Sequence, residues 1–395
     1  MGDISRKNYI DKLKKYKDLD LIKVVTGIRR SGKSTILLQF IDELKKDGIN
    51  ETQIIYYNFE KIQDDNVYDY KLLYNKIIAK KKKDKKIYVF LDEIQEVNNF
   101  EKAINSLYLD KEIDIYITGS NANLLSSEIA TYLTGRYVEI KIYPFSFKEY
   151  LDATHKSVDE SFNDYLIYGG MPYTTKLDDK EIIIEYLQTL YNTILLKDIV
   201  KRKSINEVGI LEDLSKFLCD NIGSIVSSKS ISDSLTSKGR KVSSITVNNY
   251  IIYLCESLMF SECKRFDLKG KRILETLNKI YLIDQGFKTF LTNSKSDFGH
   301  ILENIIYVEL LRRNYNVKIG KTNELEIDFI CTKNNDVKYI QVATSVLDVK
   351  TFERELRPLK SIKDNYEKLI ISFDTLPIEK DGIKVINAKN FLLAE

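Results

Sequence analysis

Several residue types are scarce in this sequence, and each scarcity excludes a class of protein. The 395 residues include no tryptophan, two histidines, four prolines and four cysteines. The cysteines are scattered without a C-x-x-C pair, which predicts free thiols in a reducing compartment and neither a disulfide framework nor a zinc site. No apolar run approaches the roughly 20 residues that span a bilayer, and the N-terminus lacks the apolar core of a secretion signal. We therefore expect a cytoplasmic protein without a membrane partner.

The overall charge and hydrophobic content are those of an ordinary globular protein. The formal net charge is +3, which indicates no strong preference for an acidic or a basic partner. Hydrophobic residues make up 43% of the chain and charged residues 30%. A basic run at 80–86 fits a nucleic-acid patch or a solvated loop, and we prefer the loop because lysine is abundant throughout. This length predicts two or three domains.

Residues 27–34 carry the strongest motif in the chain. Their sequence, Gly-Ile-Arg-Arg-Ser-Gly-Lys-Ser, fills every fixed position of the phosphate-loop pattern G-x-x-x-x-G-K-[ST]. A β-rich run at 21–26 precedes it and a helical pattern at 34–44 follows, so a bound anion would face a helix N-terminus. The pattern predicts binding of ATP and Mg²⁺. The residues expected to bind the nucleotide are Gly27, Ser31, Gly32, Lys33, Ser34 and Thr35.

A second motif supplies the acidic residues that ATP hydrolysis needs. The apolar run 87–91 suits a central parallel strand, and Asp92 and Glu93 follow it directly. We expect Asp92 and Ser34 to hold Mg²⁺, and Glu93 to polarise the attacking water. Lys33 is expected to contact the β- and γ-phosphates.

Two further candidates follow in the same region. Strand-like runs at 54–59 and 113–118 fit the same parallel sheet, and the second run ends in Gly-Ser-Asn. Asn121 is therefore a candidate sensor of the γ-phosphate, with Ser120 second, although these residues also suit a simple turn. Arg136 is a candidate source of positive charge in the transition state, in its own subunit or a neighbouring one, or a structural arginine. Arg29 and Arg30, at variable positions of the loop, receive no role.

These motifs carry a family resemblance. The phosphate loop, Leu-Asp-Glu-Ile-Gln at 91–95, Thr-Gly-Ser-Asn at 118–121 and the segment 133–150 resemble a prokaryotic group of AAA+-superfamily ATPases. Members of that group pair this domain with a C-terminal domain of unknown function. Tyr-Gly-Gly-Met-Pro at 168–172 and the segments 196–202 and 281–286 match the rest of the group, so the resemblance covers nearly the whole chain. It implies a core that depends on Mg-ATP.

The middle of the chain has the pattern of a winged helix. Helical runs at 211–222, from 230 and at 243–255 precede two strand-like runs, 258–266 and 279–283. One interpretation is DNA binding, with Thr246, Asn248 and Asn249 facing a groove and nearby lysines and arginines meeting phosphates. The other is a winged helix that contacts protein or covers the ATPase. Both stay open.

The C-terminal part resembles a PD-(D/E)XK nuclease fold that has lost its catalytic residues. Its pattern is a helix at 300–313, three strands, a helix at 352–363 and a strand at 368–373. Glu303 and Asp328 match two acidic positions of that fold, but the expected Glu-x-Lys is Gln341-Val-Ala343. Without that lysine, catalysis would require another one, such as Lys338, to take its place. We expect a binding or regulatory domain.

These observations combine into one predicted organisation. The fold class is α/β, with a P-loop AAA+-type core at 1–167, a helical linker at 168–204, a winged helix at 205–290 and a nuclease-like domain at 291–395. The leading hypothesis is a Mg-ATP-hydrolysing conformational switch or motor, with DNA and further copies of the chain as candidate partners. The alternatives are a nucleotide-gated signalling or defence module with negligible turnover and, less favoured, an ATP-dependent nuclease.

Overall fold

The chain divides into two compact units. The computed structural model describes residues 4–61, 68–81, 85–120, 133, 135–292, 297–322 and 325–394, without the side chains of 275 and 276. One unit runs to Ile142 and includes Glu256–Leu258, and the other comprises Tyr143–Cys255 and Met259–Glu395. The compact unit that contains the phosphate loop thus ends at Ile142, whereas the sequence predicts a core domain that extends to residue 167. The reason is that the helices after Ile142 pack within the second unit, where the Tyr165 hydroxyl donates to the Phe145 carbonyl (3.0 Å).

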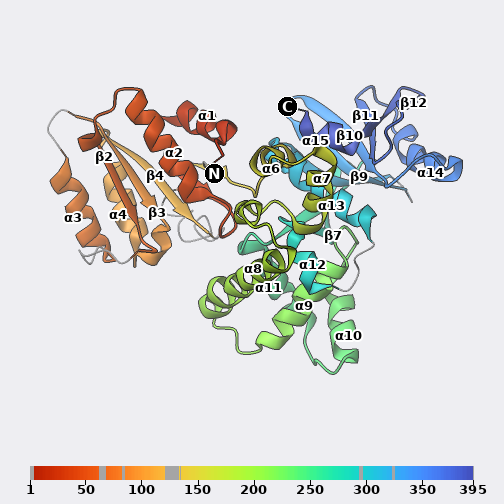
Figure 1. Cartoon of the computed structure of the whole chain (residues 1–395). Coiled ribbons are helices and arrows are strands. Elements are labelled where there is room, and N and C mark those ends of the chain that lie inside the picture. The colour runs from red at the N-terminus through yellow and green to blue at the C-terminus, as the bar shows by residue number, and fades with distance from the viewer. Residues whose placement is uncertain are drawn as a thin grey trace. The chain divides into compact units, whose positions relative to one another are not determined.

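The first unit is built on a five-stranded parallel sheet, which confirms the predicted fold class (Figure 1). Its strand order is β2-β3-β4-β1-β5, and the apolar runs that predicted strands form its core. Every residue of the central strands β1, β3 and β4 is buried, as expected for strands covered on both faces. The strands are β1 (Ile22–Thr26), β2 (Ile54–Asn58), β3 (Ile87–Asp92), β4 (Ile113–Gly119) and β5 (Tyr137–Lys141).

Helices cover both faces of this sheet. Helices α1 (Lys7–Tyr16) and α2 (Lys33–Lys46) pack on one face, in a core that includes Val25, Phe90 and Tyr116. Helices α3 (Tyr70–Lys80) and α4 (Phe100–Tyr108) pack on the other, against alternate residues of the same strands (Figure 1). The sheet is therefore covered by hydrophobic packing on both faces, and a ligand can reach it at the C-terminal ends of its strands.

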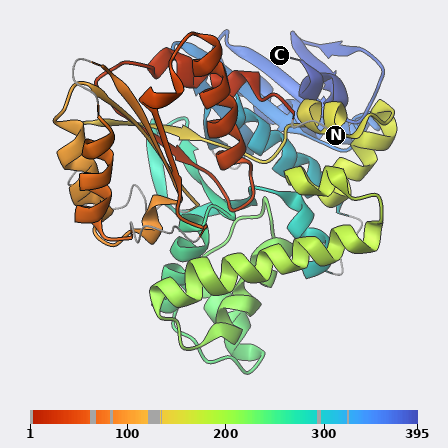
Figure 2. The ribbon, with the colours of Figure 1, turned by 60° about the vertical axis from the view of Figure 1, so that its left-hand side comes forward.

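The first half of the second unit is helical. Its helices are α6 (Phe147–Thr154), α7 (Val158–Tyr168), α8 (Lys180–Thr193), α9 (Val208–Asp220), α10 (Ser228–Ser237) and α11 (Ser244–Glu256), with a 3₁₀ turn at Pro172–Lys176. Helix α8 continues directly into a π-helical segment, Ile194–Lys201, and the two form one long rod (Figure 2). The helices predicted between 211 and 255 are confirmed as α9, α10 and α11.

The predicted hairpin exists, but it belongs to a larger sheet. Strands β6 (Phe260–Asp267) and β7 (Arg272–Leu282) pair in antiparallel fashion, and β6 also pairs with β8 (Asn316–Thr322) in parallel. The resulting sheet has eight strands in the order β12-β13-β11-β10-β9-β8-β6-β7. The boundary predicted at residue 290 therefore does not separate two sheets. A 3₁₀ turn (Gln285–Phe287) and α12 (Lys288–Leu291) lead out of the hairpin.

The remaining elements follow the predicted order of helix, three strands, helix and strand. They are α13 (Phe298–Arg312), β8, β9 (Leu325–Lys333), β10 (Asp336–Val342), α14 (Val349–Lys360) and β11 (Glu367–Ser372). Strands β8, β9 and β10 form an antiparallel meander, and β11 is parallel to β10. Three elements that the sequence did not predict complete the chain: β12 (Ile378–Lys380), β13 (Ile383–Asn387) and α15 (Ala388–Leu393). No helix in the described ranges is long and apolar enough to cross a membrane.

Candidate nucleotide-binding site

The phosphate loop joins β1 to α2 and needs glycine at both fixed positions. A Cβ atom on Gly27 would lie 2.4 Å from the Ile142 carbonyl oxygen and 2.8 Å from Ser31 Oγ. Gly32 has φ +97°, in the left-handed region that L side chains avoid, and α2 begins at the next residue. The loop backbone therefore takes a tight path that only this glycine spacing allows, and it ends at the N-terminus of a 14-residue helix.

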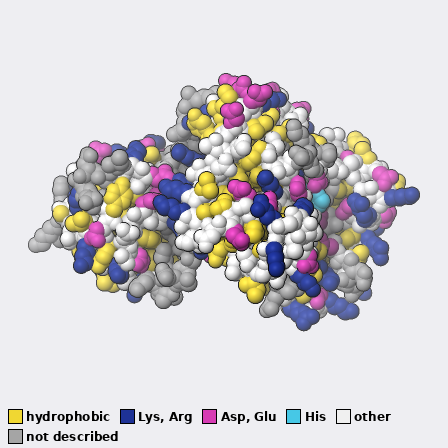
Figure 3. Space-filling model, turned by 90° about the horizontal axis from the view of Figure 1, so that it is seen from below, with side chains coloured by type: hydrophobic (Ala, Val, Ile, Leu, Met, Phe, Trp, Pro, Cys, Tyr) yellow, Lys and Arg dark blue, Asp and Glu magenta, His cyan; other side chains and the backbone are white. Residues whose placement is uncertain are grey.

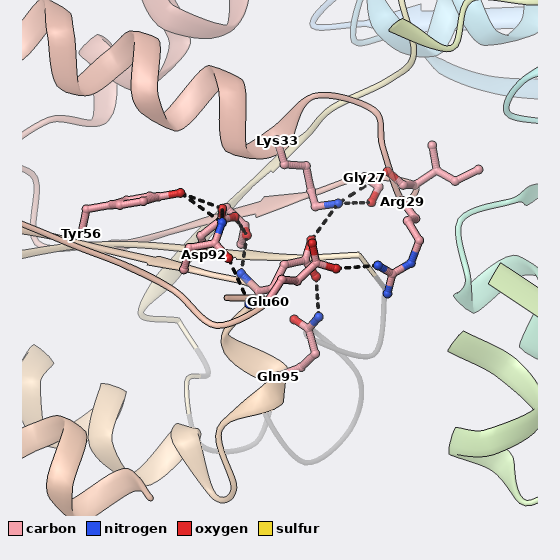
Figure 4. Close-up of polar contacts among 11 residues, drawn as sticks. Gly27, Arg29, Lys33, Tyr56, Glu60, Asp92 and Gln95 are labelled. Carbon is pink, nitrogen blue, oxygen red and sulfur yellow. Dashed lines mark hydrogen bonds and ion pairs between the residues drawn. The ribbon is translucent and has the colours of Figure 1, made fainter. Parts of the chain in front are cut away.

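Lys33 points from α2 back across the loop toward the end of β3 (Figure 4). Its ammonium donates to the carbonyl oxygens of Gly27 (3.1 Å) and Ile28 (3.5 Å). The same nitrogen lies 3.3 Å from Glu93 Oε1, and both side chains are buried. The structure thus brings together two predicted catalytic residues that lie far apart in the sequence.

Asp92, at the C-terminal end of β3, is held by three neighbouring side chains. Its Oδ1 accepts from the Thr118 hydroxyl (2.6 Å), and its Oδ2 accepts from the Tyr56 hydroxyl (3.0 Å) and the Asn58 amide (2.9 Å). Burial and the charge of Asp92 raise the pKa of Tyr56, so this phenol remains a donor. Asp92 is fully buried, and its orientation is fixed from strands β2 and β4 on either side.

Glu93 adopts a strained backbone that its neighbours stabilise. It has φ +55°, and its N–H donates to Thr118 Oγ1 (2.8 Å), while Gln95 Nε2 donates to its Oε2 (2.5 Å). Burial alone would raise the pKa of the Glu93 carboxyl, but the Lys33 ammonium and the Gln95 amide outweigh burial, and the pKa lies below its usual range. Glu93 is therefore a carboxylate at neutral pH.

Two arginines, one outside the loop and one within it, make polar contacts at the loop. Arg6, from the segment before α1, donates to the Ser31 carbonyl oxygen (3.0 Å), and Arg29 pairs with Glu60 (2.6 Å) beyond β2 (Figure 4). Ser31 Oγ is buried and has no hydrogen-bond partner within the described part of the chain. A buried hydroxyl of this kind costs free energy unless a ligand or water satisfies it.

The other predicted site residues lie elsewhere. Asn121 falls outside the described residues, and Ser120 is buried at the end of β4. Arg136 precedes β5 at the N-terminal edge of the sheet, since its carbonyl accepts from the first residue of β1, whereas the phosphate loop leaves the C-terminal edge. Its guanidinium donates to Asn105 (2.5 Å) and lies over the ring of Tyr108. Arg136 therefore does not face the loop of its own chain.

The residues of this edge fit a magnesium nucleotide. Ser34 and Thr35 lie in the first turn of α2, next to the glycine-lined path, and Asp92 and Glu93 end the strand that Lys33 faces. In the described ranges, no group of three or more His, Cys, Asp or Glu residues could hold a metal ion. Mg²⁺ usually binds through one or two carboxylates together with substrate phosphates. Ser34 and Asp92 are thus the residues that would hold it.

Sequence reasoning missed the residues that orient Asp92 and Glu93. Thr118 and Asn58 lie near the C-terminal ends of strands that the sequence predicts correctly, and Tyr56 lies two residues before Asn58. The usable signal is polar side chains near the ends of neighbouring parallel strands, which meet at one edge of a sheet. Gln95 lies within the Leu-Asp-Glu-Ile-Gln motif, but nothing in the sequence pattern alone indicates its contact with Glu93.

The nuclease-like positions of the second unit form a separate cluster. Glu303 on α13 and Asp328 on β9 both approach the ammonium of Lys279 on β7, at 3.1 and 3.9 Å. Lys338, which would have to take the place of the missing catalytic lysine, pairs instead with Glu367 (2.7 Å). The lysine that reaches these acids therefore comes from the hairpin.

Comparisons with known proteins agree with the fold. Residues 20–151 match a family model described as an AAA domain, and residues 159–297 match a domain of unknown function (DUF8612). An uncharacterised protein of Haemophilus influenzae is 40% identical over 99% of this chain and 98% of its own length. An uncharacterised protein of Methanocaldococcus jannaschii is 32% identical over 91% of this chain and 83% of its own.

Solved structures give more distant matches. The Walker-type ATPase of Pyrococcus abyssi is 16% identical and matches 73% of this chain and 96% of its own, with a TM-score of 0.49. Cdc6p of Pyrobaculum aerophilum is 13% identical and matches 78% of this chain and 96% of its own, with a TM-score of 0.33.

Proposed function

This chain belongs to a prokaryotic family of AAA-type P-loop ATPases with a C-terminal region of unknown function, and we propose that it binds and hydrolyses Mg-ATP as a conformational switch or motor. The observation that carries the proposal is the contact between Lys33 and Glu93. A lysine of the phosphate loop and an ionised glutamate meet at 3.3 Å, at the edge of the sheet where the glycine-lined loop begins. We also propose that the protein acts in the cytoplasm.

Each residue of the site has a distinct task in the proposed reaction. Lys33 moves its ammonium from the loop carbonyls and Glu93 to the β- and γ-phosphates, and this transfer frees the Glu93 carboxylate. Glu93 then orients a water molecule and accepts its proton. The water oxygen bonds to the γ-phosphorus as the bond from that phosphorus to the β–γ bridging oxygen breaks, and ADP leaves. Ser34 and Asp92 would hold Mg²⁺, which would supply positive charge to neutralise the phosphates. Thr118, Tyr56 and Asn58 keep the two acids in place.

Phosphate release by the purified full-length chain tests this proposal. We expect Mg²⁺-dependent release, loss of ATP binding in Lys33→Ala, and retained binding with turnover reduced at least ~100-fold in Glu93→Gln. Lys45→Ala is a matched control, because that lysine lies on the same helix and forms only an exposed pair with Glu51. No phosphate release with or without DNA, despite measurable ATP binding, would leave the nucleotide-gated module as the function.

One observation favours that second candidate, a module with negligible turnover. Glu93 is engaged on both oxygens, by Lys33 and by Gln95, so its carboxylate must be released before it can orient water. If Gln95 keeps its contact while nucleotide is bound, the chain binds ATP and hydrolyses it slowly. Gln95→Ala separates the two cases: turnover rises several-fold if this contact restrains Glu93 and falls if it orients Glu93.

DNA association is the finer part of the proposal. Helices α9, α10 and α11, the short bridge of Ile225 to β7, and the β6–β7 hairpin follow the order of a winged helix. Asn248 and Asn249 are exposed on α11, as DNA binding requires, but Thr246 bonds with the Ser243 hydroxyl (2.9 Å).

Other features of α11 suit a protein partner. Ile245 and Ile252 on the same helix are 73% and 45% exposed, and Arg240 pairs with Asp213. On the face shown in Figure 3, lysine and arginine side chains lie among acidic and hydrophobic ones. Duplex binding that weakens steeply with salt, and that Asn249→Ala reduces, would support DNA. Assembly with further copies, in which Arg136 faces the site of a neighbour, is tested by mass measurement in each nucleotide state.

A further inference from the structure

A buried lysine lies at the centre of the carboxylate cluster in the second unit. Lys279, on β7, is 5% exposed. Its ammonium lies 2.8 Å from Glu326 Oε1, 3.1 Å from Glu303 Oε1 and 3.9 Å from Asp328 Oδ1. One strand of the hairpin thus supplies a cation to acids on α13 and β9.

Glu303 and Asp328 also accept hydrogen bonds from groups other than Lys279. The Tyr281 hydroxyl donates to Glu303 Oε1 (2.6 Å), and the Val342 N–H donates to Asp328 Oδ2 (2.8 Å). Gln341, which replaces the expected acid, accepts from the Asp328 N–H (2.7 Å) and donates to Glu355 (3.0 Å). Its amide is therefore a structural bridge between β9 and α14.

The distances around Lys279 are those of an ammonium ion that carboxylates already bind. Charge-assisted N–H···O contacts measure about 2.7–2.9 Å, whereas Mg²⁺ and Ca²⁺ bind oxygen at about 2.0–2.6 Å. Glu326 and Glu303 lie 2.8 and 3.1 Å from the nitrogen, near the first range. Burial would lower the pKa of Lys279, but the three carboxylates outweigh it and raise the pKa above its usual value, so the ammonium stays charged.

The backbone around Lys279 is fixed on both sides. Strand β7 pairs with β6, and on its other edge the Gly223 N–H donates to the Ile280 carbonyl (3.1 Å) and the Val226 N–H to the Asn278 carbonyl (3.3 Å). The strand therefore holds Lys279 in place, and a metal ion could enter only if the lysine side chain rotated out of the cluster.

We propose that the Lys279 ammonium is the resident cation of the cluster formed by Glu303, Glu326 and Asp328, and that this cluster takes a divalent or trivalent metal ion only when the lysine is removed. The cluster then has no metal with which to activate water for phosphodiester cleavage. Its acids instead connect β7 of the hairpin to α13 and β9, through a charge carried by the chain itself.

Terbium luminescence on the nucleotide-free full-length chain tests this proposal, because tyrosine sensitises bound Tb³⁺ and Tyr281 contacts Glu303. We expect the same Tb³⁺ emission from the wild type and Glu303→Gln, since neither binds the ion in this cluster. Lys279→Met should gain a saturable signal that Lys279→Met/Glu303→Gln lacks. Lys279→Arg retains a cation and should gain nothing.

Stability gives a second measurement on the same variants. Lys279→Met leaves the three acids without their cation and should melt on the order of 10 °C lower, with Tb³⁺ or Ca²⁺ recovering part of the loss. Emission that depends on Glu303 in the wild type would overturn the proposal, and so would a folded Lys279→Met without any gain. If Lys279→Met does not fold, calorimetry of Mn²⁺ with the wild type and Glu303→Gln decides: equal binding supports the proposal and weaker binding in Glu303→Gln refutes it.

Discussion

Thr118 provides the sharpest test of how the site is built, because a single hydroxyl joins both acids. Its Oγ1 donates to Asp92 Oδ1 (2.6 Å) and accepts from the Glu93 N–H (2.8 Å), and the side chain is fully buried. Thr118→Val keeps the shape of the side chain and removes both hydrogen bonds. Asp92 then loses one donor, and the N–H of a residue with φ +55° loses the acceptor that stabilises it.

The magnitude follows from these two contacts. A hydrogen bond to an ionised carboxylate contributes roughly 1.5–3 kcal/mol, and a buried N–H left without an acceptor costs roughly 1–3 kcal/mol. We therefore expect Thr118→Val to lower the free energy of unfolding of the first unit by about 3 kcal/mol. A displacement of Glu93 on the order of 1 Å would reduce hydrolysis by about 100-fold.

Two assays separate the effects of Thr118→Val. ATP affinity should change by less than about threefold, because Gly27, Gly32 and Lys33 are untouched, whereas single-turnover hydrolysis should fall by about 100-fold. Thr118→Ser retains the hydroxyl and should recover most of the rate. Hydrolysis by Thr118→Val at near wild-type speed would refute the view that this hydroxyl positions Glu93. The stability loss remains measurable by urea unfolding even if the wild type hydrolyses ATP slowly.

Three further predictions concern single positions. Gly27→Ala should abolish ATP binding and destabilise the first unit, because the added Cβ would lie 2.4 Å from a backbone oxygen. Gly299→Ala is a mild control, because its Cβ would have its nearest neighbour at 3.8 Å. Equal ATP affinities of the two variants would contradict this prediction. Arg136→Ala should leave ATP affinity of the monomer within about twofold in a titration, and a tenfold loss would mean that Arg136 reaches its own site.

Burial raises the pKa of the Asp284 carboxyl to about 7, against about 3.9 in the unfolded chain. The folded chain therefore holds this proton more tightly, and the stability that the proton provides is complete below about pH 4. It is lost as the pH rises from about 4 to about 7, by up to about 1.4 kcal/mol per pH unit. Urea midpoints of Asp284→Asn between pH 5 and 8 should therefore vary less with pH than those of the wild type, and parallel curves would contradict this.

The parts of the site that sequence predicted are those encoded by local chemistry. The glycine spacing of 27–34 is dictated by one tight turn, and five apolar residues before Asp92 are enough to indicate a buried strand. Each pattern lies within about ten residues, so it can be recognised without knowledge of the rest of the fold. The contact of Lys33 with Glu93 follows from them once the strands are parallel.

Features that depend on contacts between distant segments were not predictable in this way. The pairing of β6 with β8 joins residues more than fifty positions apart, and nothing in the local pattern of either strand specifies that neighbour. For the same reason the local sequence patterns place the hairpin in one predicted domain and the acids of the cluster in another, although Lys279 joins them. Arg136 shows the converse: a suggestive motif lies at the wrong edge of the sheet.

Two of the buried lysines, Lys33 and Lys279, illustrate how similar contacts lead to different chemistry. Lys33 faces one carboxylate at 3.3 Å and two carbonyl oxygens, so a polyphosphate in the loop offers it more negative charge than it leaves. Lys279 faces carboxylates at 2.8, 3.1 and 3.9 Å, and an incoming anion would have to compete with all of them while being repelled by each. Exchange of partners is thus favourable for Lys33 and unfavourable for Lys279. On this reasoning Lys33 is free to exchange its partners for a nucleotide, and Lys279 stabilises the fold.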